Sequence, residues 1–398
     1  MKSGAVVMFN SADINLLAGF EQLPNSLTSK AFTADKIEFL SEISKRLLTH
    51  KDRPNVVALA YWLRKSNVAS IEREYTAKQK GAAKLEPAGL VFQIAPGNVD
   101  ALFAYYWSLS MLQGNTTVTR LSAERGEDAE LILNCLQTVL DEERFSSIKG
   151  QSSFVYYDHE KTEYTQTLSL QCDRRVIWGG NKTIERIQRY PLKSSGKDIV
   201  FPDRQSIAVV RYDTTWTDEI KDRLSKALKT DITSLGQGAC AAPLAIVWLG
   251  KVAEISAFLE REWAKIEPRF GFDQVNSLVF LHQSCALGGK RISASSVILE
   301  NNTPILSTHT RSGLWHFIYQ NIEDLDVESF SGIQTIGVFN IDNIEYKNLE
   351  EFRSACFGKH LTRLGRMLNF NVQWDGIDSL SALSVSYFTR PKWLQTAK

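Results

Sequence analysis

The sequence has few of the features that mark secreted, metal-binding or membrane-spanning proteins. Its 398 residues hold 5 cysteines, which lie far apart and form no Cys-x-x-Cys pair. We therefore expect neither a disulfide framework nor a zinc site. The 6 histidines show no metal-ligand spacing, so no metal is predicted. No run of about 18 uncharged apolar residues occurs, and this excludes a predicted membrane span.

Charge and targeting signals are equally sparse. The net charge is +1, so we expect no basic surface for nucleic acid or an anionic membrane. The apolar run at the N-terminus is too short for a signal peptide. The lack of a predicted signal peptide and the lack of a predicted disulfide framework together predict a cytoplasmic protein. No Gly-x-Gly-x-x-Gly is present either, so the usual dinucleotide fingerprint is missing.

What is present is a regular alternation of strand-like and helix-like segments. Residues 11–75 have apolar side chains three and four positions apart, which indicates helices. From residue 89 onward, short apolar runs that end in turn residues alternate with helical patterns, and this favours a doubly wound parallel sheet. The expected strands are 89–94, 116–121, 153–157, 175–178 and 206–210, with helices at 101–112, 127–140, 161–170 and 183–190.

The pattern restarts after about residue 213, which indicates a second α/β unit. Helices are expected at 217–228 and 252–263, and strands at 277–280 and 334–339. Residues 245–249 fit either a strand or a buried helix segment.

Cys240 is the most informative single residue. It lies in a run of small residues, Gly-Gln-Gly-Ala-Cys-Ala-Ala-Pro at 236–243. Glycine and alanine leave a sulfur open to approach, and backbone N–H groups at such a turn can point at a developing oxyanion. A covalent catalyst that acts on an acyl carbonyl needs both features. The alternative is that Cys240 is a small core residue.

Three further pieces suggest a cofactor or an oxyanion. Gly179 and Gly180 follow a strand and precede a helix, where a phosphate can approach the backbone. Arg120 ends a strand and could hold a ribose phosphate. Asn98, in a Pro-Gly-Asn turn, could donate its amide to an oxyanion. Taken singly, each also has an ordinary structural explanation.

The order of these motifs resembles one family. The matching segments are 93–99, 112–120, 175–184, 198–204, 237–243, 334–337 and 374–378. Over residues 88–385 the chain is similar to LuxC-type acyl-CoA reductases, the acyl-thioester reductase subunits of bacterial bioluminescence systems. That family belongs to the aldehyde dehydrogenase superfamily.

The resemblance implies an aldehyde dehydrogenase-like α/β fold. It comprises a Rossmann-like cofactor domain and an α/β catalytic domain with a cleft between them. On this basis residues 1–87 form a mostly helical segment that packs on the cofactor domain. Residues 88–212 form the NADP-binding domain, residues 213–385 the catalytic domain with Cys240, and residues 386–398 a C-terminal tail.

The resemblance also implies roles for individual residues. Cys240 aligns with the nucleophile that takes the acyl group, and Asn98 with the oxyanion-hole asparagine. Arg120 stands where the superfamily carries a lysine facing the adenosine ribose, and Gly179 and Gly180 lie at the turn beneath the pyrophosphate. Gln334 replaces the usual ribose-binding glutamate. Arg120 and family habit favour NADPH over NADH.

One departure bears on the reaction. Oxidising aldehyde dehydrogenases carry a glutamate base in a Glu-Leu-Gly-Gly-Lys motif before the cysteine, whereas this chain reads Arg-Gln-Ser-Ile-Ala at 204–208, with Asp203 only nearby. That base activates water to hydrolyse the thioester. Without it, reduction of an acyl thioester (acyl-CoA or acyl-protein, with a fatty acyl chain expected) fits better.

Other readings stay open. The chain could oxidise aldehydes with NAD(P), or it could be a non-catalytic acyl carrier beside an acyl-activating synthetase. A papain-like hydrolase lacks a suitable histidine motif. An acyl-protein synthetase is an expected partner, and the superfamily favours a homo-oligomer. His316, Tyr105, Tyr106 and Trp107 are interpreted as core residues.

Overall fold

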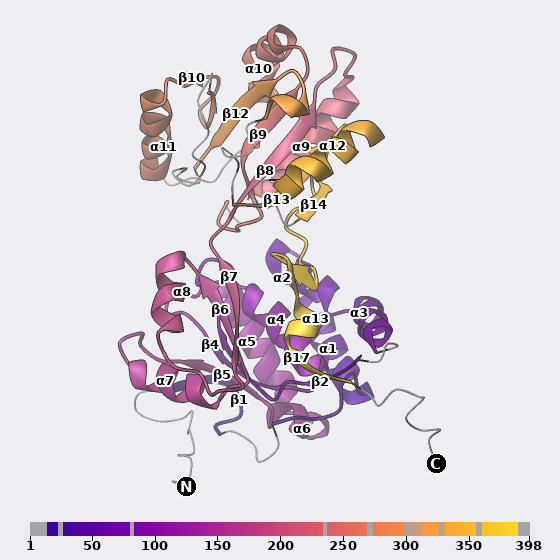
Figure 1. Ribbon diagram of the computed structural model, residues 1–398, viewed down its shortest axis with the longest axis vertical. Coiled ribbons are helices and arrows are strands. Elements are labelled where there is room, and N and C mark those ends of the chain that lie inside the picture. Colours follow the sequence, from indigo (N-terminus) through magenta and orange to yellow (C-terminus); the bar gives the residue numbers. More distant parts are fainter. Residues whose placement is uncertain are drawn as a thin grey trace. The chain divides into compact units, whose positions relative to one another are not determined.

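The structure is a computed structural model of the chain. The structure describes residues 14–22, 27–79, 83–233, 237–268, 274–299, 306, 309, 312–325, 330, 332–355 and 360–388. Gly236, Cys356 and residues 389–398 of the predicted tail lie outside the described residues. The chain divides into two compact units, unit 1 from Met1–Asp203 with Ile377–Lys398, and unit 2 from Arg204–Gly376. Figure 1 shows the elements of both units.

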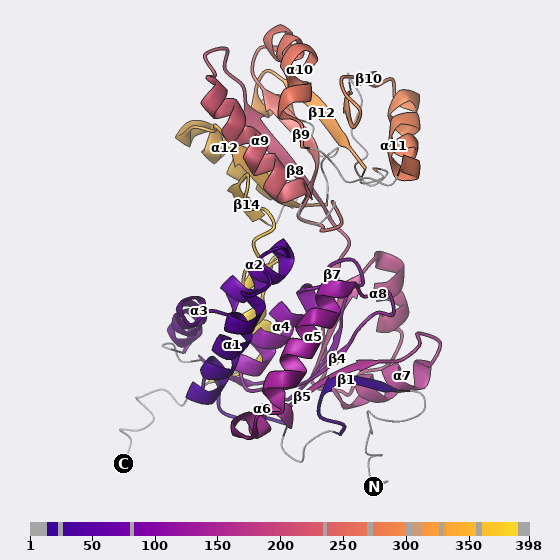
Figure 2. The same cartoon turned by 180° about the vertical axis from the view of Figure 1, so that it is seen from behind.

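Unit 1 is built on one six-stranded sheet with the order β1-β5-β4-β3-β6-β7. Its strands are parallel except β1, which pairs antiparallel with β5. The helices lie on both faces of the sheet (Figures 1 and 2). The strands are β1 (Asn15–Gly19), β3 (Leu90–Ile94), β4 (Thr116–Arg120), β5 (Ser152–Tyr156), β6 (Arg174–Gly179) and β7 (Lys197–Pro202).

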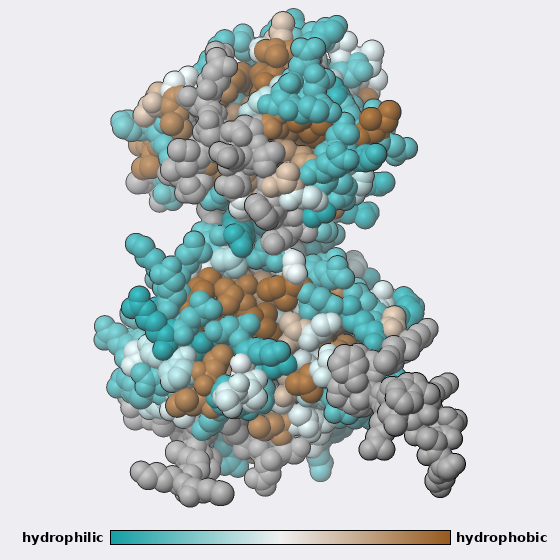
Figure 3. All heavy atoms as spheres, viewed as in Figure 1, coloured by the Kyte–Doolittle hydropathy of each residue, from teal (hydrophilic) through white to brown (hydrophobic). Residues whose placement is uncertain are grey.

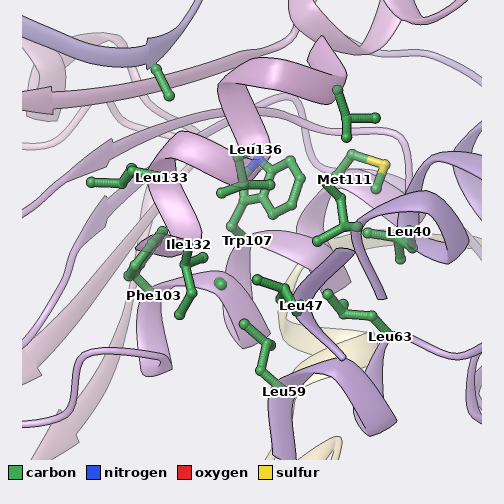
Figure 4. Packing of buried hydrophobic residues seen from close by; sticks show 14 of the residues in the cluster. Leu40, Leu47, Leu59, Leu63, Phe103, Trp107, Met111, Ile132, Leu133 and Leu136 are labelled. Atoms are coloured by element: carbon green, nitrogen blue, oxygen red, sulfur yellow. The ribbon is translucent and has the colours of Figure 1, made fainter. Parts of the chain in front are cut away.

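One face of this sheet is covered by the N-terminal helices together with α4 and α5. Trp107 of α4 lies at the centre of their packing, with leucines of α1 and α2 on one side and α5 on the other (Figure 4). The Trp107 side chain is fully buried, and its indole N–H donates to the Ser152 hydroxyl at 3.2 Å. These helices are α1 (Ala34–Leu47), α2 (Pro54–Trp62), α4 (Leu102–Leu112) and α5 (Glu127–Leu140), and α3 (Lys65–Lys78) follows α2.

The opposite face packs against α7 (Thr162–Gln171) and α8 (Asn181–Gln188). Alternate residues of each strand point to opposite faces. Accordingly Phe154 of β5 joins the cluster with Trp107, and its neighbour Val155 joins the cluster beneath α7 and α8. The short helix α6 (Ser146–Lys149) precedes β5.

The C-terminal segment returns to unit 1. After α13 (Ser379–Ala382), β17 (Ser384–Phe388) pairs antiparallel with β2 (Ala83–Pro87). Residues 386–388, predicted as the start of a tail, are therefore part of this strand.

Unit 2 is built on a seven-stranded sheet with the order β10-β11-β12-β9-β8-β13-β14. Only β10 is antiparallel to its neighbour. The strands are β8 (Gln205–Arg211), β9 (Pro243–Leu249), β10 (Lys290–Arg291), β11 (Ser296–Ile298), β12 (Leu314–Tyr319), β13 (Ile333–Phe339) and β14 (His360–Arg363).

Two buried clusters cover the two faces of this sheet. Helices α9 (Asp218–Thr233) and α10 (Val252–Ile266) pack on one face, and α12 (Asn343–Ala355) packs on the other together with Phe280 of α11 (Gln274–Ala286). The last strand of unit 2 is β15 (Gln373–Trp374), and β16 (Ile377–Asp378) begins the C-terminal segment of unit 1.

The predicted α/β class with parallel sheets is confirmed, and three local predictions are wrong. Residues 15–19 lie in the region 11–75 that was expected to be helical, but they form strand β1 at the edge of the unit 1 sheet. Strand 206–210 was placed with the first sheet, but β8 lies in the second sheet between β9 and β13. Residues 277–280 were expected as a strand, but they belong to helix α11, with the Leu278 residue 67% exposed. Residues 245–249, left open between strand and helix, are part of β9.

Candidate functional site

The loop that carries Cys240 connects α9 to β9 in unit 2. Gln237 begins its described part with φ 58, a left-handed conformation that costs energy for any residue with a side chain. Its side-chain amide compensates by donating to the Pro243 carbonyl at 3.0 Å and to the Gly313 carbonyl at 2.9 Å. Gln237 is fully buried. These bonds fix the first described residue of the loop to the start of β9 and to Gly313, the residue before β12.

The backbone around Cys240 is held from both sides. The N–H of Ala242 donates to the Ala239 carbonyl at 3.0 Å, which closes a tight turn. The Cys240 carbonyl accepts the Ser206 hydroxyl at 2.8 Å. Cys240 itself is half-buried, so it is not enclosed in the core as the alternative interpretation required.

Gln334 lies at an irregularity in β13 within the same unit. The pairing of β13 with β8 shifts register between Ile333 and Thr335, which makes Gln334 the extra residue of a bulge. Its side chain is 2% exposed, and Oε1 has no hydrogen-bond partner among the described residues. Such an orphaned buried oxygen is the type of group that a bound hydroxyl satisfies.

An ionisable group stabilises the helix before the Cys240 loop. Asp231, at the end of α9, accepts hydrogen bonds from the backbone N–H groups of Gly365 and Met367. Burial nevertheless raises the pKa of Asp231 to about 6, and the backbone N–H donors only partly offset this.

The predicted oxyanion residue Asn98 and the predicted cofactor residues of unit 1 lie at one edge of its sheet. Asn98, in the turn after β3, is exposed, Arg120 ends β4, and Gly179 ends β6. Because β4, β3 and β6 are parallel neighbours, the structure brings these residues to the same carboxyl edge. Ligands of open α/β sheets bind outside this edge. In Figure 3, apolar side chains gather on unit 1 where the ends of β6 and β7 lie in Figure 1.

Gly180 is the N-cap of α8, with φ −66 and ψ 157. A methyl group built on it would meet nothing within 4 Å, whereas one on Gly179 would lie 3.3 Å from the Thr183 side chain. The chain therefore gives Gly180 no steric reason to be glycine. The open space at a helix N-terminus fits the close approach of a phosphate.

Arg120 is fixed but not fully satisfied. Its Nη2 donates to the Tyr157 carbonyl at 3.2 Å, and its guanidinium lies 4.9 Å from the Tyr157 ring centroid. Its Nε is buried without a partner among the described residues. This remaining donor leaves Arg120 able to bind an acceptor oxygen of a ligand.

The core interpretation from the sequence is confirmed for Tyr106, Trp107 and His316, whereas Tyr105 is only partly buried. Trp178 stacks on Phe201 with ring centroids 3.8 Å apart, and the fully buried Tyr106 meets both rings edge-on. His316 is also fully buried, and its Nδ1 accepts the Trp248 indole N–H at 2.9 Å. Burial lowers the pKa of His316 to about 3, so it is a neutral packing residue.

Sequence reasoning missed Ser206. This fully buried residue is the second of β8. It links the Cys240 carbonyl to β13, because its hydroxyl also accepts the Thr335 N–H at 3.1 Å. The only signal in the sequence is one serine before an apolar strand.

Comparison with solved structures identifies the fold. The chain is similar to an oxidoreductase from Marinobacter aquaeolei, with TM-score 0.67, 10% identity, and 98% of each chain covered. It is similar to aldehyde dehydrogenase 21 from Physcomitrella patens, with TM-score 0.65, 11% identity, and 89% and 85% covered. For glyceraldehyde-3-phosphate dehydrogenase GapN from Methanocaldococcus jannaschii, in complex with NADP, the TM-score is 0.61, with 15% identity and 89% and 88% covered. The fold is therefore that of the aldehyde dehydrogenases.

A search of curated proteins finds no match. Among the described helices, none is both long and apolar enough to cross a bilayer. The family model for acyl-CoA reductase (LuxC) matches residues 64–271. This is more than half of the chain and includes Asn98, Arg120, Gly179, Gly180 and Cys240, but not Gln334. The chain therefore belongs to the acyl-CoA reductase (LuxC) family of oxidoreductases.

Proposed function

We propose that this protein reduces an acyl thioester to the aldehyde with NADPH, through an acyl group carried on Cys240. One observation carries the proposal: a single acyl-CoA reductase family model covers both Asn98 and Cys240. The two hydrogen bonds that hold the backbone around Cys240 support it. The substrate is an acyl-CoA or an acyl-protein, with a fatty acyl chain as the first choice.

In the first step the Cys240 thiolate attacks the thioester carbonyl carbon. A carbon–sulfur bond forms to Cys240, the bond to the carrier sulfur breaks, and the carrier leaves as its thiol after taking a proton. The amide of Asn98 and the backbone N–H of Cys240 stabilise the oxyanion that develops. The Ala239 carbonyl is engaged inside the turn, so the N–H of the same planar peptide points the opposite way, out of the turn.

The residues at the carboxyl edge of unit 1 fit a dinucleotide. Gly180 leaves open space at the N-terminus of α8, and the buried Nε of Arg120 has no partner among the described residues. We assign the pyrophosphate to Gly179 and Gly180, the adenosine ribose phosphate to Arg120, and a ribose hydroxyl to Gln334. When bound, NADPH supplies the hydride that reduces the acyl carbonyl.

Reduction rather than oxidation follows from the residues at 204–208. The segment Arg-Gln-Ser-Ile-Ala holds no carboxylate that could activate water, and Ser206 within it is engaged with the Cys240 and Thr335 backbones. An acyl group on Cys240 is therefore protected from hydrolysis until hydride arrives.

The test incubates the protein with NADPH and acyl-CoAs of graded chain length while absorbance loss and aldehyde are measured. Cys240→Ala and Cys240→Ser should abolish aldehyde formation and covalent acyl labelling, and retention of either activity would refute the proposal. Asn98→Ala should lower the rate about 10²–10³-fold. Carboxylate formed from aldehyde without any thiol carrier would favour aldehyde oxidation instead.

Cofactor choice is tested separately. Wild type should show a higher kcat/KM with NADPH than with NADH, and Arg120→Ala should remove most of that preference. Failure to bind NADPH in a fluorescence titration would favour a non-catalytic acyl carrier.

The wider context of the proposal is a cytoplasmic homo-oligomer that receives acyl groups from an acyl-protein synthetase. Light scattering of the purified protein measures its oligomeric state. Co-purification with such a synthetase, followed by transfer of a labelled acyl group to Cys240, tests the partnership.

A further inference from the structure

Ser206 occupies an irregular point of the unit 2 sheet. It pairs with Pro243 of β9, while the next residue, Ile207, pairs with Ala245, so Leu244 is an extra residue. On the other side, the ladder with β13 shifts at Gln334. Both neighbours of β8 therefore bulge beside the same serine. Bulges interrupt regular backbone pairing and occur next to active sites.

The Ser206 hydroxyl takes over the interrupted pairing. It accepts the Thr335 N–H at 3.1 Å and donates to the Cys240 carbonyl at 2.8 Å. Ser206 is fully buried and Thr335 is 1% exposed, so water offers these groups no ready replacement. The hydroxyl is thus the direct link between the Cys240 loop and the strand that carries Gln334.

The two hydrogen bonds at Cys240 fix its direction. The Ala242 N–H holds the carbonyl of the peptide that precedes Cys240, at 3.0 Å. Ser206 holds the carbonyl of the peptide that follows it. Since each peptide is planar, fixing both planes fixes the backbone angles of Cys240 and therefore the direction of its Cα–Cβ bond.

We propose that Ser206 is a positioning residue for acyl transfer, which aims the Cys240 thiol by holding the carbonyl of the same residue. This rests on the proposed function of Cys240. Ser206 does not touch the reacting atoms. It keeps the thiol in the position required for attack on the thioester carbonyl. A displacement of the thiol by about 1 Å can cost about 10²-fold in rate.

The decisive comparison uses Ser206→Thr and Ser206→Val, which have nearly the same shape and differ in the hydroxyl. Single-turnover acylation of Cys240 by an acyl-CoA is measured without NADPH, and then kcat and KM with NADPH. We expect Ser206→Val to lose about 10–100-fold in acylation rate and in kcat. Ser206→Thr should remain within about fivefold of wild type. Ser206→Ala should behave like the valine variant.

Ser284 provides a matched control. It is also fully buried, donates to the Phe280 carbonyl at 2.7 Å and accepts the Trp315 indole N–H at 3.0 Å. Ser284→Ala should lower the unfolding temperature about as much as Ser206→Ala while acylation stays unchanged.

Equal acylation rates for the valine and threonine variants at position 206 would overturn the proposal. So would an equal loss of acylation in Ser284→Ala, because general destabilisation would then explain the effect. If wild type forms neither acyl-enzyme nor aldehyde, the proposed function fails and the role of Ser206 falls with it. A wild type that acylates normally beside an unaffected Ser206→Val variant leaves the proposed function standing and removes only the role of Ser206.

Discussion

A glutamine in the left-handed region shows how one side chain can offset backbone strain. At Gln237, replacement by glycine relieves about 1–2 kcal/mol of strain. It also removes two hydrogen bonds to buried carbonyls, each worth about 1–3 kcal/mol when its partner is left unsatisfied. We expect Gln237→Gly to lower the free energy of unfolding by about 1–3 kcal/mol, and Gln237→Ala by about 1 kcal/mol more. Urea unfolding measures both, and a glycine variant as stable as wild type would contradict the argument.

Gly180 allows stability and cofactor binding to be separated. A Cβ at this position meets nothing within 4 Å, and serine is a better N-cap than glycine by a few tenths of a kcal/mol. We therefore expect Gly180→Ser to unfold at the same or a slightly higher temperature, while its KM for NADPH rises about tenfold or more because the side chain fills the phosphate space. Thermal unfolding and steady-state kinetics test this pair of effects. An unchanged KM for NADPH would contradict the assignment of the pyrophosphate to this turn.

The candidate residues were predictable where a motif names them, and Ser206 was not. Cys240, Asn98 and the glycine pair stand in recognisable strings at turns. The structure places Cys240, Asn98 and Gly180 outside the strands and helices and makes Gly179 the last residue of β6. The Ser206 hydroxyl joins the Cys240 carbonyl to Thr335, and Thr335 lies 129 residues later in the chain than Ser206. A buried serine has the same sequence appearance whether or not its hydroxyl orders a loop, so only the fold reveals it.

At the scale of elements, strong helical periodicity was sufficient to locate a helix. Local patterns were not sufficient to show which sheet a strand joins. The helix predicted over 127–140 coincides with α5. Strand 206–210 was recognised, but its partners β9 and β13 come later in the chain, and local patterns carry no information about them. The short apolar run 277–280 fits helix and strand equally well, and α11 shows that the helix was correct.

His316 gives β12 a defined pH response. Burial lowers the pKa of His316 to about 3, while an unfolded histidine titrates near 6.5. The unfolded state therefore binds the proton first, so this stability contribution is complete above about pH 6.5 and decreases progressively as the pH falls toward 3. We expect the stability difference between wild type and His316→Asn, which cannot titrate, to shrink by about 2 kcal/mol between pH 7.5 and pH 5.

Urea unfolding of both proteins at the two pH values measures this change. Asparagine keeps an acceptor for the Trp248 indole N–H, which donates to His316 Nδ1 in the wild type. The comparison therefore isolates the effect of histidine protonation on stability. A stability difference that stays constant with pH would show that His316 titrates in the folded protein.

For the whole molecule, the main fact hidden from the sequence is that the last segment belongs with the first unit. Residues 213–385 were expected to form one catalytic domain, yet Ile377–Lys398 belong to unit 1. The reason is chemical: Arg174, at the start of β6, is 5% exposed and donates to the carbonyls of Ala382 and Ser384 at 2.8 and 2.7 Å. A charged donor thus holds the end of the chain through contacts 208 and 210 residues apart.

This connection predicts that a single substitution loosens one unit and not the other. Arg174→Met keeps the volume but leaves buried carbonyls without a charged donor, which costs about 3 kcal/mol. We expect faster hydrogen exchange in β2 and β17, with β9 and β12 unchanged, because multidomain chains need not unfold in one step. Lys251→Met, which removes an exposed ion pair to Glu254 in unit 2, should change stability by less than about 1 kcal/mol. If β9 loses protection as much as β17, the two units unfold as one, and the C-terminal segment stabilises the whole chain rather than unit 1 alone.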